Sequence, residues 1–533
     1  MQPPRSVVII GGGTAGWMSA VYLNRALGPT TSITLAESPQ IGTIGVGEAS
    51  FNTLKAFFDY VGLDESEWMP PSQASYKLGI KFVDWTTTGR SFFHPFQRYD
   101  DVQGLGLPEW WLHNHRDRPF DRVCFTVPAI AHAKRAPKTF DGSVFETRVA
   151  YPYAYHFDAG LLAAHLREVA TRRGVSHVQG TVKDVDVDAA GMIARVRLDA
   201  DRSLEADLFI DCTGFRGVLT RQALGEDWLP FSSSLFCDRA LAVRIPHDDA
   251  ADGIRPYTTS TALSSGWVWD IPLKERTGTG YVYSGSFLDD DSARQELRRH
   301  LGRRLARDAE PNLVRFRCGR LRNSWVGNCV ALGLSSSFVE PLESTAIFTI
   351  QHGLLELINH LPAREGDDRL RASYNRAVNA CVDGIRDFLI MHYYCNDRRD
   401  TPFWEATKRD TVVPDELRER LEVWRHRLPN PTTVNQRFHG FYPFSYTVMM
   451  LGMSGGPAHS HPLLTYVDPR QAEGRFAALR AREWELCEVL PRHDEYLDAL
   501  YQGRLEPAQP GAAENSRPIV SAHVAAAGRA LGP

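Results

Sequence analysis

The sequence predicts an α/β fold in which a Rossmann-like module carries a mixed β-sheet insertion and is followed by a helical C-terminal module. Three observations support this prediction. An apolar strand, a glycine-rich turn and a helix follow one another between residues 6 and 27, and strand and helix patterns alternate from there to about residue 334. From about Ser344 to Ala499 the pattern is mostly helical. At 533 residues, the chain is also too long for one compact core.

Each element is expected from its own local pattern. Residues 6–10 (SVVII) are an apolar run typical of a buried parallel strand, and residues 32–36 form a second strand that ends at Glu37. The glycine turn after the first strand leads into a helix over residues 14–27. Further elements are expected as a helix at 160–173, strands at 175–179, 204–211 and 328–334, and a hairpin at 182–198 that turns at 189–191.

These elements divide the chain into three parts. We expect residues 1–343 to form the cofactor-binding module, with inserted strands that face the substrate. Residues 344–505 are expected to form a mainly helical module that covers the substrate. Residues 506–533 are rich in Ala, Pro and Gly and are expected to be a flexible tail.

Composition and charge exclude several classes of protein. Hydrophobic residues make up 43% and charged residues 23%, as in ordinary soluble enzymes. Lys plus Arg (60) nearly balance Asp plus Glu (64), which argues against a protein that grips nucleic acid or an anionic membrane. No apolar run reaches the roughly 18 residues of a membrane span, and the chain enters its first strand without a secretory signal, so we expect a cytoplasmic protein. Eight separate cysteines without a C-x-x-C pair predict neither disulfides nor a metal site.

The glycine turn predicts a dinucleotide site. Residues 11–16 (GGGTAG) fit G-x-G-x-x-G, in which Gly11 permits the tight turn, Gly13 lets the backbone approach a pyrophosphate and Gly16 permits close packing of helix on strand. The positive end of the helix dipole then faces the phosphates. Glu37, at the end of the second strand, is placed to accept a hydrogen bond from a ribose hydroxyl.

Two later segments favour FAD as the dinucleotide. Residues 211–214 (DCTG), at the end of an apolar strand, resemble the later dinucleotide-contacting strand of the flavoprotein hydroxylases. Residues 330–337 (VALGLSSS) resemble the segment of those enzymes that meets the flavin. The sequence holds no second complete glycine motif for NAD(P)H, so we expect a separate flavin reductase to supply reduced FAD.

The sharpest motif is residues 266–272 (GWVWDIP). An aromatic-rich strand that ends at proline is the ordinary interpretation of W-x-W, but W-x-W-x-I-P in a chain that binds FAD resembles the signature of the flavin-dependent tryptophan halogenases. The resemblance extends over most of the chain, through GVGEA at 45–49, SYKLGIKF at 75–82, DCTG at 211–214 and FVEPLEST at 338–345. These motifs stand in the order in which the family has them.

The resemblance implies that reduced FAD, dioxygen and chloride yield hypochlorous acid, which the protein must direct to an indole ring. Lys77 matches the catalytic lysine, whose amine hydrogen-bonds the acid or traps it as a chloramine. Lys81 is a second candidate, because alternation along one strand would place both lysines on one face. Trp267 and Trp269 match the tryptophans that keep the substrate away from the flavin. The resemblance adds cofactor contacts at Thr14, Ala15, Gly47, Glu48, Ala49, Asp211 and Leu334.

Residues 340–346 supply the expected carboxylate and halide contacts. Glu343 matches the active-site glutamate, which polarises the chlorinating species or accepts the proton that the ring loses. Glu340 is three residues away and could share a face with it. Ser344 matches a hydrogen-bonding neighbour. The resemblance places chloride against the backbone amides of Thr345 and Ala346, although glycine is the family's usual residue at the second position.

The expected substrate pocket departs from the pattern for free tryptophan. His94 and Phe96 match the pair that lines the indole slot, and Phe441 with Tyr442 matches a Phe-Trp pair whose second ring stacks on the indole. Residues 428–438 are fewer than in the free-tryptophan halogenases, and Arg437 stands about where a glutamate would hold the substrate ammonium.

We therefore expect an indole without a free amino-acid head. The first choice is a tryptophan residue of a peptide precursor, as in the lantibiotic tryptophan halogenases of antibiotic biosynthesis. Free tryptophan, another indole natural product and ordinary flavin monooxygenation are the alternatives, and a catalytically silent flavin-binding scaffold is a further one. A homodimer would be unsurprising for this family.

Overall fold

The computed structural model describes residues 4–40, 42, 47–144, 152–247, 253–361, 368–434 and 439–505. The expected tail at 506–533, the first part of the GVGEA motif and Arg437 lie outside these ranges. Within them, no helix combines the length and the apolar character that crossing a membrane requires.

A six-stranded sheet forms the Rossmann-like module. Its strands lie in the order β10-β2-β1-β14-β23-β22, and β1 pairs in parallel with both β2 and β14. The strands are β1 (Ser6–Ile10), β2 (Ser32–Glu37), β10 (Ser176–Gln179), β14 (Leu208–Asp211), β22 (Trp325–Val326) and β23 (Cys329–Ala331). β23 is shorter than the expected 328–334 because the backbone turns at Gly333, where φ is +63°. β14 also begins later than expected, since residues 203–204 belong to a separate strand, β13.

The two faces of this sheet are covered by different elements. On one face, Val7 and Ile9 share a hydrophobic cluster with side chains of α1 (Thr14–Leu27), α7 (Ala159–Arg172) and α9 (Ala346–His360). On the other face, Val8 and Ile10 contact the predicted hairpin, which consists of β11 (Val182–Val187) and β12 (Ile193–Leu198). The alternation along β1 therefore buries both faces, as expected for a central parallel strand.

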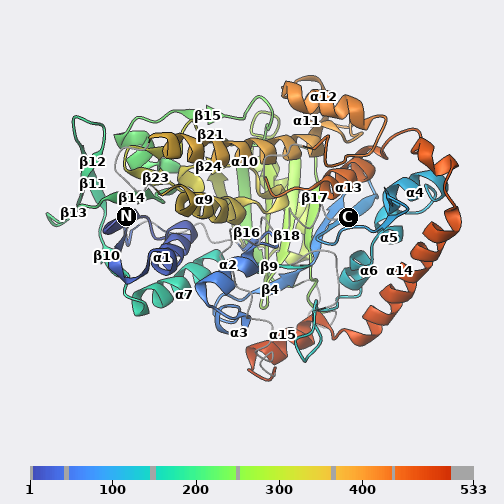
Figure 1. Ribbon diagram of the computed structural model, residues 1–533, viewed down its shortest axis with the longest axis horizontal. Helices are drawn as coiled ribbons and strands as arrows, with labels where there is room; N and C mark the ends of the chain where they lie inside the picture. Colours follow the sequence, from blue (N-terminus) through green and yellow to red (C-terminus); the bar gives the residue numbers. More distant parts are fainter. Residues whose placement is uncertain are drawn as a thin grey trace.

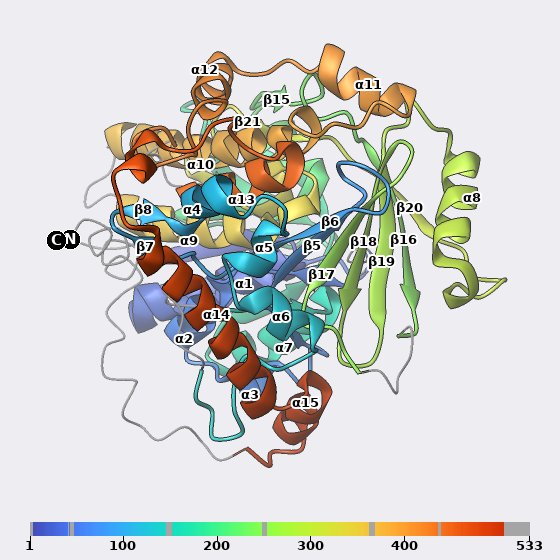
Figure 2. The same ribbon diagram turned by 90° about the vertical axis from the view of Figure 1, so that its right-hand side faces the viewer.

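A seven-stranded sheet forms the predicted mixed insertion. Its order is β20-β16-β19-β18-β17-β5-β6, and all neighbours are antiparallel except β17 and β5. The strands are β5 (Gly79–Val83), β6 (Ser91–Pro95), β16 (Arg239–Ile245), β17 (Thr258–Ala262), β18 (Gly266–Pro272), β19 (Thr277–Tyr283) and β20 (Asn312–Arg315). Helix α8 (Asp290–Leu301) covers one face of this sheet (Figure 2). The W-x-W motif lies on β18, at the centre of the sheet.

The segment that carries the two candidate lysines is not one strand. Lys77 ends β4 (Ser75–Lys77), which pairs with β9 (Ala154–Phe157), whereas Lys81 lies on β5 in the seven-stranded sheet. Leu78 separates the two strands, and its amide donates to the carbonyl oxygen of Pro256. The expectation that alternation places both lysines on one face is therefore wrong, because the chain changes sheets between them.

The C-terminal part is helical, as expected, and Figure 1 shows its two central helices, α9 and α10, side by side. α10 spans Asp368–Tyr394, and the other helices of this part are α11 (Pro402–Arg409), α12 (Asp415–Trp424), α13 (Pro443–Ser454), α14 (Pro469–Val489) and α15 (His493–Tyr501). Both of the largest hydrophobic clusters contain side chains from before and after residue 344. The two parts thus share their cores, and the boundary at 343/344 stays a prediction.

The remaining elements are short and connect the sheets. They are α2 (Leu54–Val61), α3 (Glu65–Trp68), α4 (Leu107–Asn114), α5 (Phe120–Val123), α6 (Val127–His132), β3 (Glu48–Ala49), β7 (Asp101–Val102), β8 (Leu105–Gly106), β13 (Ser203–Leu204), β15 (Trp228–Pro230), β21 (Gly319–Leu321) and β24 (Ser337–Phe338). Together with β4 and β9, β3 forms a small sheet that leads from the Rossmann-like module to Lys77.

Candidate active site

A cavity of about 570 Å³ lies at the carboxyl ends of β1, β2 and β14, the edge at which α/β sheets bind nucleotides. Most of the predicted cofactor residues line it: Gly11, Gly13, Thr14, Ala15, Glu37, Gly47, Glu48, Ala49 and Leu334. At its far side it is lined by Trp269 and by Ser344, Thr345 and Ala346.

The glycine turn leaves no room for side chains. Gly11 has a φ of +114°, and a Cβ there would lie 2.2 Å from the carbonyl oxygen of Cys212. A Cβ at Gly16 would lie 1.8 Å from the carbonyl oxygen of Gly11. Gly16 therefore serves helix-on-strand packing, whereas Gly11 and Gly13 expose backbone to the cavity, as a pyrophosphate site requires.

Two acidic side chains of this cavity suit a polar cofactor. Glu37 ends β2, and Nε2 of His177 on the neighbouring strand β10 lies 2.8 Å from its Oε1. Glu48 is partly buried, and burial, with a smaller contribution from Asp158, raises its pKa to about 7. Its Oε2 has no hydrogen-bond partner among the described residues. A buried polar atom in a cavity wall calls for a ligand group, so these residues fit the expected flavin dinucleotide.

Asp211, expected to contact the cofactor, does not line this cavity. Its carboxylate accepts hydrogen bonds from the backbone amides of Thr213, Leu219 and Thr220 and from the hydroxyl of Ser335. These bonds direct the Asp211 side chain toward the loop after β14. Residues 212–216 of that loop line the cavity instead of Asp211. The role of Asp211 is to hold that loop.

A second, smaller cavity of about 40 Å³ has aromatic walls. Lys77, Glu343, His94, Phe96 and Tyr442 line it, as predicted for the substrate end of the site. Sequence reasoning missed the other lining residues, which are Phe51, Asn52, Ile80, Pro95, Arg98, Gly440, Phe444 and Ser445.

One hydrogen bond joins the two cavities. Nζ of Lys77, in the wall of the aromatic cavity, donates to Oγ of Ser344, in the wall of the larger one, over 2.9 Å. Nζ also donates to the carbonyl oxygen of Ser50 at 3.2 Å and lies 5.4 Å from the ring centre of Phe96. Burial lowers the pKa of Lys77 to about 7, against the attraction of Glu343. Lys81 is only half-buried and lines neither cavity.

The turn at residues 341–346 directs its side chains to different cavities. A 3-10 turn, Pro341–Glu343, ends at Ser344, which has a left-handed backbone (φ +61°, ψ +39°), and α9 begins two residues later. Left-handed backbone is uncommon for serine and is concentrated at functional sites. As a result, Glu343 lines the aromatic cavity, whereas Ser344, Thr345 and Ala346 line the larger one.

Two histidines hold Glu343. Nδ1 of His94 lies 3.1 Å and Nε2 of His392 lies 2.9 Å from the same carboxylate oxygen, Oε1. Burial acts to raise the pKa of Glu343, but the two histidines outweigh it and lower the pKa to about 2. Sequence reasoning missed His392, whose only signal was its place on the buried face of a long helix, four residues after Phe388.

Glu340 lies apart from Glu343 and does not share its face. Its Oε2 accepts hydrogen bonds from Nε1 of Trp267 (3.0 Å) and from the hydroxyl of Tyr393 (2.5 Å). Burial raises the pKa of Glu340 to about 7. Trp267 therefore faces Glu340 and not the large cavity, so that only Trp269 of the W-x-W pair lines that cavity.

Phe441 and Tyr442, the two aromatic residues expected in the substrate slot, do not both line it. Phe441 is buried behind the cavity and stacks on Phe388, with ring centres 3.8 Å apart, so it is a packing residue and lines no substrate surface. Tyr442 lines the cavity, with the guanidinium of Arg98 4.5 Å from its ring centre.

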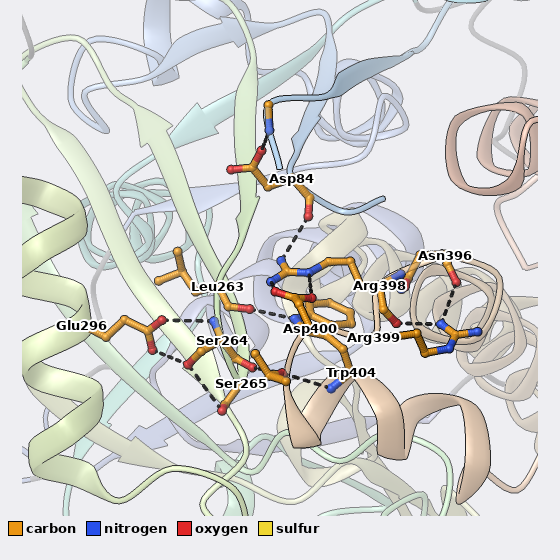
Figure 3. Close-up of polar contacts among 12 residues, drawn as sticks. Asp84, Leu263, Ser264, Ser265, Glu296, Asn396, Arg398, Arg399, Asp400 and Trp404 are labelled. Atoms are coloured by element: carbon orange, nitrogen blue, oxygen red, sulfur yellow. Dashed lines mark hydrogen bonds and ion pairs between the residues drawn. The ribbon is translucent and has the colours of Figure 1, made fainter. Parts of the chain in front are cut away.

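A network of polar contacts ties the end of α10 to the turn before β18 (Figure 3). Arg398, just after α10, donates to the carbonyl oxygen of Asp84 over 3.0 Å, and its guanidinium lies 4.7 Å from the ring centre of Trp404. Nε1 of Trp404 in turn donates to the carbonyl oxygen of Leu263 over 2.8 Å. The network holds α10, which carries His392, in a fixed relation to the tryptophan strand.

This architecture is similar to known enzymes along almost the whole chain. A profile of the tryptophan halogenase family matches residues 6–469. A tryptophan 6-halogenase of Streptomyces toxytricini is 44% identical over 518 residues, which are 94% of this chain and 99% of the relative. Its crystal structure gives a TM-score of 0.90 and covers 93% of this chain and 100% of that chain. A 7-chloro-L-tryptophan 6-halogenase of Kutzneria sp. is 43% identical over 510 residues, 92% of this chain and 98% of the relative.

A peptide-modifying enzyme is less similar. The crystal structure of a lanthipeptide tryptophan 5-halogenase shares 31% identity with this chain, with a TM-score of 0.83 and 98% of both chains covered. The comparisons therefore do not support the expected peptide substrate over free tryptophan.

Proposed function

Because this chain belongs to the tryptophan halogenase family, whose members are flavin-dependent enzymes, we propose that it halogenates the indole ring of free tryptophan. The observation that carries this proposal is the hydrogen bond between Lys77 and Ser344. It places one amine between the cavity that suits a dinucleotide and the cavity that suits an aromatic ring.

Bound as reduced FAD, with dioxygen and chloride, the cofactor supplies hypochlorous acid. The cofactor would be held by residues that line the larger cavity, namely the glycine turn, Glu37, residues 47–49 and Leu334. A separate flavin reductase would deliver it in the reduced form, because the sequence holds one complete dinucleotide motif.

Lys77 would capture and aim the oxidised halogen. With a pKa of about 7, roughly half of its amines are uncharged at neutral pH, and an uncharged amine can accept a hydrogen bond from hypochlorous acid or take up its chlorine as a chloramine. The hydrogen bonds to Ser344 and to the carbonyl oxygen of Ser50 fix Nζ in place. In the chloramine path chlorine passes from oxygen to Nζ, and the proton that Nζ loses leaves with the hydroxide as water.

Glu343 would accept the proton that the ring carbon loses when it gains chlorine. Its carboxylate lines the same cavity as Lys77, and its low pKa keeps it ionised and able to take up a proton at neutral pH. His94 and His392 stabilise the negative charge before the transfer.

Chloride would lie at the start of α9, against the backbone amides of Thr345 and Ala346. Both residues line the larger cavity, and the hydroxyl of Thr345 has no hydrogen-bond partner among the described residues. The side chain of Ala346, where the family usually has glycine, would narrow this site and favour the smaller halide. Trp269 would separate the organic substrate from the cofactor.

Free tryptophan is favoured over a peptide for two reasons. The Kutzneria relative, 43% identical, is named for 7-chloro-L-tryptophan, a free amino acid, whereas the lanthipeptide enzyme is 31% identical. The aromatic cavity is also small and closely walled by rings, which suits a single indole better than a peptide chain.

Mass spectrometry of parallel reactions tests the proposal. Each reaction contains the enzyme, FAD, a flavin reductase, NADH and chloride, with either L-tryptophan or a tryptophan-containing peptide. We expect a gain of one chlorine for one hydrogen on L-tryptophan, and NMR of the product then identifies the carbon. Chlorination of the peptide alone would confirm a halogenase but contradict free tryptophan as its substrate.

A further inference from the structure

Arg98 lies in the wall of the aromatic cavity and forms no ion pair within the described part of the chain. Its guanidinium lies 4.5 Å from the ring centre of Tyr442 and 5.8 Å from that of Phe444. Its Nε is buried and has no hydrogen-bond partner, and the side chain forms no ion pair with any residue in the described part of the chain. Leaving a buried N–H of a charged group without an acceptor is unfavourable, so this group is suited to a ligand.

Side chains on either side of Arg98 are held by other parts of the chain. Oε1 of Gln97 accepts hydrogen bonds from the backbone amides of Thr126 and Val127, both over 3.0 Å. Asp100, the nearest following carboxylate, is paired with Arg475. Arg98 is therefore held at the cavity without an internal counter-ion among these neighbours.

The charges that line the cavity favour an anionic group. The cationic side chains in its wall are Lys77 and Arg98, and the one carboxylate among the described lining residues, Glu343, already contacts His94 and His392. A guanidinium that stacks on aromatic rings keeps its N–H edge free for two parallel hydrogen bonds to a carboxylate, which an ammonium cannot match.

We propose that Arg98 binds the carboxylate of the substrate, so that this enzyme selects indoles with a carboxylate on the side chain at C3. The inference rests on the proposed halogenation of tryptophan, and it names the group that recognises the amino-acid head. The required ligand class is an indole-3-alkanoate. Tryptophan and indole-3-propionate both carry the carboxylate, and indole-3-propionate lacks the amine. Tryptamine carries the amine but no carboxylate.

Equilibrium binding to the enzyme with oxidised FAD tests the inference without turnover. Calorimetry compares L-tryptophan, indole-3-propionate and tryptamine on the wild-type protein and on Arg98→Ala. We expect Arg98→Ala to weaken both carboxylates on the order of 10- to 100-fold, as for loss of a charged hydrogen bond, and to leave tryptamine nearly unchanged. Arg98→Lys keeps the positive charge but lacks the paired N–H donors of the guanidinium. This variant should therefore recover part of the affinity for the two carboxylates.

Arg90→Ala is the matched control, since this exposed arginine lies in the loop at the other end of the β5–β6 hairpin and should not change any affinity. Equal weakening of all three ligands by Arg98→Ala would overturn the inference, because it would show a packing role alone, and so would no weakening at all. Absence of chlorinated tryptophan from wild-type enzyme that binds L-tryptophan through Arg98 would instead count against the proposed function.

Discussion

Nε2 of His392 lies 2.9 Å from Oε1 of Glu343, and Nδ1 of the same ring lies 2.9 Å from the carbonyl oxygen of Phe388. The ring of His392 thus lies between the backbone of its own helix and the buried carboxyl group. Contacts with His94 and His392 outweigh the effect of burial and lower the pKa of Glu343 to about 2, so its carboxyl group is ionised at neutral pH.

This pair predicts a change in the pH profile of His392→Leu. Without His392, burial of Glu343 is opposed mainly by His94, so the pKa of Glu343 should rise. Glu343 acts as the anion, and activity is lost as pH falls through its pKa, so the acid limb of kcat should move to higher pH. His392→Gln retains one N–H donor and should shift the limb less. An unmoved acid limb in both variants would contradict the role of His392 in lowering the pKa of Glu343.

Lys77→Ala should abolish halogenated product and leave FAD binding intact. Nζ of Lys77 is the only amine in the described wall of the aromatic cavity, whereas the glycine turn and Glu37, which would bind the cofactor, lie elsewhere in the fold. Product is measured by mass spectrometry and FAD binding by fluorescence titration. Lys81→Ala is the control and should retain activity; normal turnover by Lys77→Ala would end the lysine hypothesis.

The low pKa of Lys77 predicts a rise in rate with pH. Burial lowers this pKa to about 7, so the amine is protonated below neutrality and increasingly free above it. If the free amine handles the oxidised halogen, single-turnover halogenation should increase as pH passes through about 7 and then level off. A rate that falls over the same range, while FAD stays bound, would show that the ammonium is the active form.

Glu343→Gln and Glu340→Gln should differ strongly. Glu343→Gln removes the proton acceptor of the aromatic cavity, and halogenation should slow by about 10²- to 10⁴-fold. In Glu340→Gln the amide oxygen can still accept from Trp267 and Tyr393, so turnover should stay close to that of the wild type. Steady-state rates with L-tryptophan measure both, and the reverse ranking would show that the other carboxyl group is the base.

Gly11→Ala should prevent FAD binding. The new Cβ would lie 2.2 Å from the carbonyl oxygen of Cys212 at a φ of +114°, which costs about 1–3 kcal/mol in backbone strain before any clash. Gly28→Ala is the control, because Gly28 also has positive φ (+69°) but nothing within 4 Å. Both variants should lose some thermal stability, and only Gly11→Ala should lose flavin absorbance after gel filtration.

Local patterns in the sequence were enough to predict the Rossmann-like module and its glycine turn. The strand at residues 6–10, the helix at 14–27 and the hairpin at 182–198 each depend on neighbours within a few residues, so periodicity and glycine spacing predict them. The resemblance to a family supplied Lys77 and Glu343, which the fold then brings to one cavity. In these cases the information lies along the chain.

Tertiary structure alone decided which side chains share the site. Residues 77 and 81 separate because the chain changes sheets at Leu78, and Trp267 and Phe441 turn from the cavities toward Glu340 and Phe388. His392 reaches Glu343 from 49 residues away, and Arg98 meets Tyr442 from a distant part of the chain. Such contacts depend on how helices and sheets pack against one another, and packing is set by the whole core, which no local pattern of residues encodes.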